Sequence, residues 1–253
     1  MRRILILGGT AEARQLAARL AQRGDLAATL SLAGRTANPA VQPVPVRIGG
    51  FGGVDGLAEY LAAERIDILI DATHPYAAVM ATNAARAAAV AGVRLVALRR
   101  PPWTPVAGDR WIEVADVQAA VAALGEAPRR VFLALGRKEL APFAAAPQHH
   151  YLVRSVDPVE PPLAVPNATY VTGRGPFTQS GDHALLSAHR IEIVVAKNSG
   201  GSATYSKIAA ARALGLTVVL LARPPLPAVT AVTTIAEVEA FIDHAAPRAE
   251  RDV

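Results

Sequence analysis

The sequence predicts an α/β fold of two lobes, each with a mostly parallel sheet. Short apolar strands alternate with alanine-rich helical stretches along most of the chain. This alternation restarts in the second half, and the two halves contain a pair of similar segments. Strands that alternate with helices form parallel sheets covered on both faces, because each helix carries the chain back to the same end of the sheet.

The first half of the chain supplies five predicted strands and three predicted helices. Each strand is a short apolar run bounded by turn residues, and each helix is a longer run rich in alanine and leucine, which favour helical conformation. The strands are expected at Arg3–Leu7, Ala27–Leu32, Val44–Ile48, Asp67–Ile70 and Arg94–Leu98, and the helices at Ala11–Arg23, Leu57–Glu64 and Ala77–Val90.

The second half repeats this plan. Residues 157–166 are rich in proline and are expected to form a surface loop. The strands are expected at Arg130–Leu135, Tyr151–Val153, Thr169–Val171, Ile191–Val195 and Thr217–Leu221, and the helices at Gln179–His189 and Ala203–Leu214.

An internal repeat sets the expected domain boundary. The segments 67–102 and 191–225 share the order strand, helix, strand and Arg-Pro-Pro, and an offset of 123 residues aligns Pro101 with Pro224. A short strand and a helix follow each segment, so we expect lobes at residues 1–127 and 128–253. Ligands of open parallel sheets bind beyond the carboxyl ends of the strands. If the lobes face each other, these loops line one cleft between them.

Composition excludes several classes of protein. The chain has no cysteine, which excludes disulfides, thiol catalysis and cysteine-ligated metal centres. None of the six histidines has the spacing of metal ligands, so no metal site is predicted. Aromatic residues make up 5% and do not interleave with basic ones, which argues against nucleic acid. No apolar run is long enough to cross a membrane, so a cytoplasmic protein is expected. Nothing in the sequence sets an oligomeric state.

The first turn of the chain is typical of a nucleotide site. An apolar strand runs into a glycine turn and then a helix, whose start attracts phosphate. The pattern G-x-G-x-x-G/A is met at Gly8, Thr10 and Ala13, with Thr10 in place of the second glycine. The alternative is an ordinary strand–helix turn capped by Thr10.

The end of the second strand indicates which nucleotide binds. An NAD site usually has an acidic residue there to hold the ribose hydroxyls. This chain has Ser31, Arg35 and Thr36 instead. Arg35 can pair with a 2′-phosphate, with two hydroxyl donors beside it, which favours NADPH over NADH. The alternative is that Arg35 is simply solvated.

Two further loops carry polar groups suited to chemistry. In Asp71–Ala77, His74 and Tyr76 are the strongest proton-handling groups near the nucleotide turn, although a packed His74 is the alternative. In Asn198–Lys207, glycines and hydroxyl groups at a helix start are typical of an anion site. Only three of the 26 basic residues are lysines, and all three follow predicted strands. They predict a ligand with several negative groups, unless they are merely solvated: Lys138, Lys197 and Lys207, with Arg137 and Arg174.

Five motifs carry a resemblance to a known family. They are GGTAEAR at 8–14, DATHPYA at 71–77, GRKEL at 136–140, RGPF at 174–177 and KNSGG at 197–201. In this order they resemble the precorrin-6A reductases of cobalamin biosynthesis over nearly the whole chain. The resemblance implies two Rossmann-like lobes, of which the first binds NADPH and the second binds substrate.

The resemblance also implies a reaction and a substrate. NADPH would give a hydride to a ring double bond of precorrin-6A, and a proton would complete the reduction to precorrin-6B. This macrocycle is fringed with carboxylates, which would explain the basic loops. A similar reductase acts on cobalt-precorrin-6A, and the expected NADPH preference favours the metal-free branch. Other possibilities are an NADPH reductase of a different conjugated substrate, or a nucleotide-sensing protein without turnover.

Individual roles follow from the resemblance as hypotheses. The proton donor is left open between His74, Tyr76 and water. The residues expected to hold the pyrophosphate and ribose are Gly9, Thr10, Glu12 and Ala13, those for the 2′-phosphate are Ser31, Arg35 and Thr36, and those beside the nicotinamide are Gly49, Gly50, Ala72 and Thr73. The residues expected to bind substrate or close over the cofactor are Arg137, Lys138, Ser199, Gly200, Thr204 and Lys207.

Overall fold

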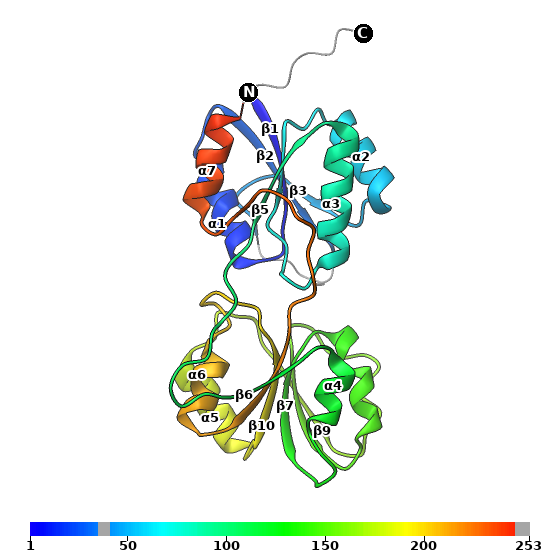
Figure 1. The fold of residues 1–253 in the computed structure, drawn as a ribbon, viewed down its shortest axis with the longest axis vertical. Coiled ribbons are helices and arrows are strands. Elements are labelled where there is room, and N and C mark those ends of the chain that lie inside the picture. Colours follow the sequence, from blue (N-terminus) through cyan, green and yellow to red (C-terminus); the bar gives the residue numbers. More distant parts are fainter. Residues whose placement is uncertain (35–40, 246–253) are drawn as a thin grey trace. The chain divides into compact units, whose positions relative to one another are not determined.

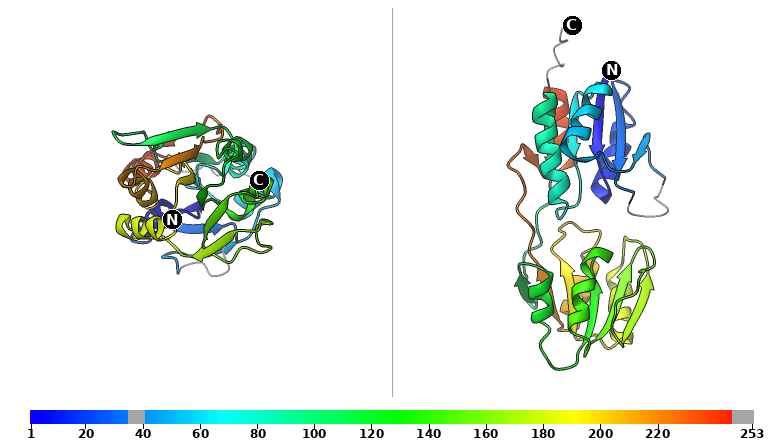
Figure 2. Two further views of the ribbon diagram at one scale, coloured as in Figure 1. Left: turned by 90° about the horizontal axis from the view of Figure 1, so that it is seen from below. Right: turned by 90° about the vertical axis from the view of Figure 1, so that its right-hand side faces the viewer.

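The computed structural model describes residues 1–34 and 41–245 and divides into two compact units. The first unit combines Met1–Pro101 with the segment that begins at Pro224, and the second unit is Pro102–Arg223. Two stretches of chain connect the units, one drawn in green and one in orange (Figure 1, Figure 2). Each unit contains one six-stranded sheet.

The sheet of the first unit has the strand order β12-β5-β4-β1-β2-β3, and every neighbouring pair is parallel. Side chains alternate across the sheet. Ile4 and Ile6 therefore pack with helices α1 and α7, whereas Leu5 and Leu7 pack with α2 and α3 on the other face (Figure 1). The elements are β1 (Arg2–Leu7), α1 (Ala11–Leu20), β2 (Leu26–Leu32), β3 (Val46–Ile48), α2 (Gly53–Ala63), β4 (Ile68–Asp71), α3 (Ala78–Ala91), β5 (Arg94–Leu98), β12 (Ala231–Val232) and α7 (Ile235–His244).

The sheet of the second unit has the order β6-β11-β10-β7-β8-β9 and is also parallel throughout. Phe132, Leu152 and Val194 pack with helices α5 and α6 on one face, and α4 lies on the other (Figure 1). The elements are β6 (Arg110–Val114), α4 (Val117–Ala122), β7 (Arg130–Ala134), the 3₁₀ turns η1 (Arg137–Glu139) and η2 (Ala141–Ala145), β8 (His150–Ser155), β9 (Ala168–Thr172), α5 (Gln179–Ala188), β10 (Ile193–Lys197), α6 (Ser206–Ala213) and β11 (Thr217–Leu221).

The α/β class with two mostly parallel sheets is confirmed, and each predicted strand and helix is present, most of them with shifted ends. The largest shift is in α2, which begins at Gly53 rather than at the predicted Leu57. The first turn of α2 contains two glycines, which are poor helix formers, so the pattern of helix-favouring residues starts one turn late. The turns η1 and η2 were not predicted.

The expected boundary at residues 127 and 128 differs from the division in the structure. Strand β6 and helix α4 belong to the second unit, because β6 pairs with β11 from Arg110 to Val114. Strand β12 pairs with β5, and α7 buries Val238 and Ile242 in the core of the first unit. The two units thus exchange their sixth strand. Local sequence indicates that a strand forms, but the sheet it joins depends on contacts with residues far away in the chain.

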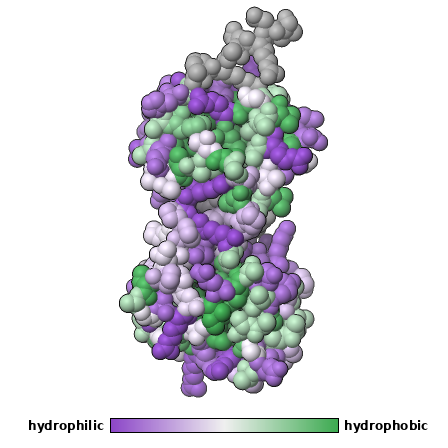
Figure 3. Space-filling view, in the orientation of Figure 1, coloured by the Kyte–Doolittle hydropathy of each residue, from purple (hydrophilic) through white to green (hydrophobic). Residues whose placement is uncertain are grey.

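The surface of the described residues mixes polar and apolar groups. Figure 3 shows hydrophilic and hydrophobic residues side by side over the visible face. Large exposed hydrophobic residues such as Val79 on α3 and Ile112 on β6 belong to different elements. In residues 1–34 and 41–245, no helix combines the length and apolar character that a bilayer crossing requires.

His149 should make the stability of the second unit depend on pH. Its side chain is fully buried, and its Nδ1 accepts a hydrogen bond of 3.1 Å from the Arg129 amide. Burial lowers the pKa of His149 below its usual value of about 6.5. The unfolded chain therefore binds a proton that the folded chain resists, so stability falls as the pH drops below about 6.5. His149→Asn should flatten this part of the profile in urea denaturation between pH 7 and pH 5. Parallel profiles for the two proteins would contradict this expectation.

Candidate functional site

Both sheets have a topological switch point beside one central strand, β1 in the first unit and β7 in the second. In the first unit, β2 lies on one side of β1 and β4 on the other, and in the second unit β8 and β10 flank β7 in the same way. Ligands of open α/β sheets bind outside the carboxyl ends of the strands at such a point. The candidate site residues therefore lie in the loops after β1 and β4 in the first unit and after β7 and β10 in the second.

The loop after β1 presents the start of α1 to this edge of the sheet. Gly9 has a φ of +109°, a conformation that glycine adopts without strain. Thr10 caps the helix, since its Oγ1 accepts a hydrogen bond of 3.1 Å from the Ala13 amide and donates one of 2.8 Å to the Ala72 carbonyl. The first-turn amides have no acceptor within the helix and attract an anion. Ala13 is fully buried, and its amide already donates to Thr10 Oγ1, so Ala13 offers no free donor to a ligand.

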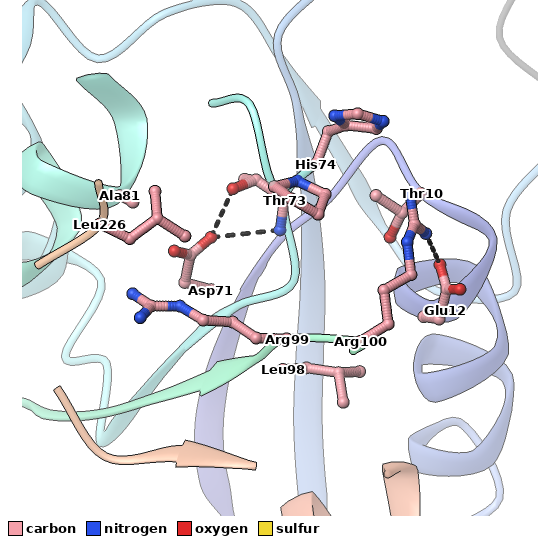
Figure 4. A pocket seen from close by; sticks show the side chains of 11 residues that line it. Thr10, Glu12, Asp71, Thr73, His74, Ala81, Leu98, Arg99, Arg100 and Leu226 are labelled. Atoms are coloured by element: carbon pink, nitrogen blue, oxygen red, sulfur yellow. Dashed lines mark hydrogen bonds and ion pairs between the residues drawn. The ribbon is translucent and has the colours of Figure 1, made fainter. Parts of the chain in front are cut away.

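The loop after β4 is organised by a buried carboxylate. Asp71 is 5% exposed, and its Oδ1 accepts hydrogen bonds from the Thr73 amide at 3.1 Å and the Thr73 hydroxyl at 2.6 Å (Figure 4). His74 and Tyr76 are half-buried, and the His74 Nδ1 accepts a hydrogen bond of 3.3 Å from the Tyr76 amide. The structure thus brings Ala72 and Thr73 beside Thr10.

A pocket lies between these two loops and the end of β5 (Figure 4). Sequence reasoning missed its two arginines, Arg99 and Arg100. Arg99 Nη1 and Nη2 each lie 3.2 Å from the Pro227 carbonyl oxygen, and Arg100 forms an ion pair of 2.5 Å with Glu12. The pocket is lined by Thr10, Glu12, Asp71, Thr73, His74, Pro75, Ala81, Leu98, Arg99, Arg100 and Leu226.

The signal that could have found Arg100 is the repeated Arg-Pro-Pro. Of the 26 basic residues, 23 are arginines, so a single arginine does not stand out in the sequence. Arg100 and Arg223 nevertheless occupy equivalent places in the repeat, and the structure puts both at the points where the chain passes between units.

The ends of β2 and β3 lie on the other side of β1 from β4. Ser31 is 6% exposed, and its carbonyl accepts a hydrogen bond of 2.9 Å from Gly8. The carbonyls of Gly49 and Gly50 accept hydrogen bonds of 2.6 Å and 2.8 Å from the Arg47 guanidinium. We expect Gly49 and Gly50 beside Ala72 and Thr73. The strand order instead places these two glycines on the side of Ser31. Arg35 and Thr36 lie outside the described residues.

In the second unit, the loop after β7 carries exposed positive charge. Arg137 and Lys138 are exposed, and Arg137 Nη1 lies 3.5 Å from the Pro158 carbonyl oxygen. The next residue, Glu139, forms an ion pair of 2.7 Å with Lys197, which ties the end of β10 to η1. These contacts leave Lys138 as the lysine best placed to meet an anionic ligand from solvent.

The loop after β10 is buried at its start, from Asn198 to Gly200. Ser199 is 8% exposed and Gly200 is also buried. Lys207 is only 5% exposed, and its Nζ donates a hydrogen bond of 2.5 Å to the Thr204 carbonyl. Its ammonium also lies 5.1 Å from the centre of the Trp103 ring. The three lysines, which we expected to act alike, therefore have three different environments.

A buried ion pair supports the loop that contains the RGPF motif. Arg154 pairs with Asp182, and the exposed fractions of the two side chains are 9% and 3%. Asp182 also accepts a hydrogen bond of 2.6 Å from Ser206, the first residue of α6. The Arg154 guanidinium lies 3.8 Å from the centre of the Phe177 ring. The pair therefore connects β8, α5, α6 and the RGPF motif.

The described parts of the chain contain no group of three or more histidine, aspartate or glutamate side chains that could hold a metal ion. The candidate site therefore consists of helix starts, hydroxyl groups and arginine or lysine side chains. Such donors bind anionic groups.

Comparisons with known proteins point in one direction. The family model described as precorrin-6x reductase CbiJ/CobK matches residues 3–243. A precorrin-6A reductase from Rhodobacter capsulatus is 54% identical over 97% of this chain and 98% of its own. One from Sinorhizobium is 58% identical over 87% of this chain and 85% of its own. A cobalt-precorrin-6A reductase from Priestia megaterium is 28% identical over 93% of this chain and 96% of its own.

A solved structure agrees with this match. The structure of a CobK precorrin-6A reductase superposes with a TM-score of 0.94 at 54% identity, covering 98% of this chain and 99% of that one. The family match extends over both units and includes all the loops described above. The chain therefore belongs to the precorrin-6x reductase family, CbiJ/CobK.

Proposed function

We propose that this enzyme reduces precorrin-6A to precorrin-6B in cobalamin biosynthesis and uses NADPH as the reductant. The observation that carries the proposal is the identity of 54% to a precorrin-6A reductase over 97% of the chain. Identities to five precorrin-6A reductases are 44–58%, whereas those to three cobalt-precorrin-6A reductases are 26–29%. This difference favours the metal-free substrate. The reaction adds one hydride and one proton across a carbon–carbon double bond.

The first unit fits a dinucleotide. Its strand order has the switch point that such cofactors span, and the Gly9–Thr10 turn opens the start of α1 to the pyrophosphate. Bound NADPH would supply the hydride. We assign Ser31, Gly49 and Gly50 to the adenosine side, with Arg35 and Thr36 at the 2′-phosphate. We assign Thr73, with the pocket that it lines in Figure 4, to the nicotinamide side.

The second unit offers groups for a substrate with several carboxylates. Arg137 and Lys138 are exposed cations in the loop after β7, where they can pair with carboxylates at little desolvation cost. Ser199, Gly200 and Thr204 shape the loop after β10, and buried Lys207 supports this loop through the Thr204 carbonyl. A polycarboxylate tetrapyrrole suits this set of groups.

The test of the function is NADPH oxidation by the purified protein with precorrin-6A, followed together with the absorbance of the macrocycle. We expect both signals to change in a one-to-one ratio. Equal turnover of cobalt-precorrin-6A would remove the preference for the metal-free substrate. Binding of NADPH with no turnover of either tetrapyrrole would instead indicate a different reductase or a nucleotide sensor.

The cofactor preference has its own test. Arg35→Ala should weaken NADPH binding far more than NADH binding, because only NADPH carries the 2′-phosphate. Quenching of intrinsic fluorescence by each nucleotide measures both dissociation constants. An equal response of the unmodified protein to NADPH and NADH would contradict the assignment of Arg35.

His74 and Tyr76 should each be dispensable to within about tenfold in kcat, since hydride transfer depends mainly on the positions of the two reacting groups. His74→Gln and Tyr76→Phe retain the size of each side chain while removing its acid or base. Steady-state kinetics at saturating NADPH would measure the effect. A loss much greater than tenfold in either variant would identify that residue as the proton donor and exclude water.

A further inference from the structure

Asn198 contacts both segments in which the chain passes between the units. The first passage lies between Pro101 and Pro102, and the second between Arg223 and Pro224. Asn198 Oδ1 accepts a hydrogen bond of 2.8 Å from the Trp103 amide, and its Nδ2 donates one of 3.0 Å to the Trp103 carbonyl. The Asn198 carbonyl accepts a hydrogen bond of 2.8 Å from Arg223 Nε. All these contacts lie within the second unit.

The side-chain amide is the chemical group that this place requires. Its NH2 group donates and its oxygen accepts, and these match the carbonyl and the amide of a single peptide residue. Asn198 is 8% exposed, so an aspartate here would set a carboxylate against the Trp103 carbonyl, and an alanine would leave two buried backbone groups without a partner. The backbone amide of Asn198 is also engaged, by the Leu221 carbonyl at 3.2 Å.

Trp103 in turn contacts the loop after β10. Its indole Nε1 donates a hydrogen bond of 2.7 Å to the Gly201 carbonyl, and its ring meets the Tyr205 ring edge-on at 5.5 Å. Gly200 and Gly201 have φ values of +67° and +68°, so this loop holds a left-handed conformation at two successive residues. The indole hydrogen bond fixes the carbonyl at the end of that glycine pair.

We propose that Asn198 is a positioning residue, which fixes the loop of residues 199–204 through Trp103 and does not itself touch the ligand. The four polar groups of Asn198 each have a protein partner, which is the arrangement of a structural clamp. Because residues 199–204 are assigned to substrate binding, the effect on catalysis rests on the proposed function. Asn198 would then govern the KM for the tetrapyrrole and leave cofactor binding in the first unit unchanged.

The experiment uses the full-length protein with Trp103 as its single tryptophan. The chain has two tryptophans, and Trp111→Phe removes the other, whose buried Nε1 has no hydrogen-bond partner among the described residues. In this background, Asn198→Asp and Asn198→Ala should shift Trp103 emission to longer wavelength and increase its quenching by acrylamide. The KM for precorrin-6A should rise about tenfold, the change expected for one orphaned buried hydrogen bond. The Kd for NADPH should stay within about twofold, which is much less than the change that the loss of one hydrogen bond would cause.

Two further variants separate positioning from direct contact. Trp103→Phe keeps a ring but removes the donor to Gly201, so it should raise the KM in the same way, and its effect should not add to that of Asn198→Ala. The exposed Asn167→Asp is the matched control in the same unit and should change neither readout. A raised KM with unchanged Trp103 emission would show that Asn198 touches the substrate, which would overturn the proposal.

The remaining outcomes are also decisive. An unchanged KM in a protein whose Trp103 has become accessible would show that the loop does not need Asn198. If the parent protein does not reduce precorrin-6A at all, the proposed function fails. Trp103 emission and quenching still test whether Asn198 holds Trp103 in place. Unchanged emission and quenching in both Asn198 variants would overturn the structural part of the proposal, whatever the activity.

Discussion

Asp182→Ala should destabilise the second unit by about 3–5 kcal/mol, the usual cost of removing one partner of a buried ion pair. The variant leaves the Arg154 charge in a place where its side chain is 9% exposed, and it removes the acceptor of the Ser206 hydroxyl. Asp182→Asn keeps the shape and an acceptor oxygen but also leaves Arg154 without a counter-ion, so its loss should be only slightly smaller. Most of the cost is the desolvated charge that remains without a counter-ion.

Tryptophan fluorescence during urea denaturation measures this loss in the relevant unit. Both tryptophans, Trp103 and Trp111, belong to the second unit, so the signal reports its unfolding and not that of the first unit. Glu192→Gln is the control in the same unit: Glu192 and its partner Arg129 are 42% and 47% exposed, and glutamine keeps an acceptor for the Arg130 amide. An exposed pair of this kind is worth less than about 1 kcal/mol. If the two variants lost similar stability, the buried pair would not hold the unit together.

Arg100→Gln should weaken NADPH binding by about 2 kcal/mol, or roughly thirtyfold. Glu12 lies in the first turn of α1, where we place the pyrophosphate, and a carboxylate there repels phosphate. The ion pair with Arg100 offsets this charge, and the two side chains are only 14% and 25% exposed, so solvent screens them weakly. Removing the guanidinium leaves the repulsion in place.

The double variant Glu12→Gln with Arg100→Gln is the diagnostic control. If Arg100 acts by neutralising Glu12, removing both charges should restore most of the affinity, as measured by fluorescence titration with NADPH. Glu12→Gln alone should change the dissociation constant little. A double variant that binds as weakly as Arg100→Gln would show instead that Arg100 contacts the cofactor directly.

The sequence was sufficient to predict the elements of both sheets, because strand and helix patterns are local. The apolar runs that became β1 and β4 and the alanine-rich run that became α3 needed no knowledge of the rest of the chain. It was not sufficient for the exchange of β6 and β12. A strand such as Arg110–Val114 has the same local pattern whichever sheet it completes, and only its pairing with β11 decides.

The candidate site divides in the same way. That Thr10 and Thr73 lie in loops just after strands was predictable, since each follows a local apolar run. The burial of Lys207 was not predictable, because it depends on Trp103, which comes from more than a hundred residues earlier in the chain. The partner of Arg100 was equally hidden, because Glu12 and Arg100 meet only when β5 has joined the sheet.

On the ribosome, the second unit has all its strands as soon as Arg223 has emerged, whereas the first unit still awaits β12 and α7. While residues 102–223 are being made, the edge of β5 still lacks its neighbour β12. The apolar side of α1 at Leu16 and Ala17 is also exposed, because α7 does not yet cover it. Such an edge is open to pairing with other chains. The part of the protein that is synthesised first is therefore the last to be completed.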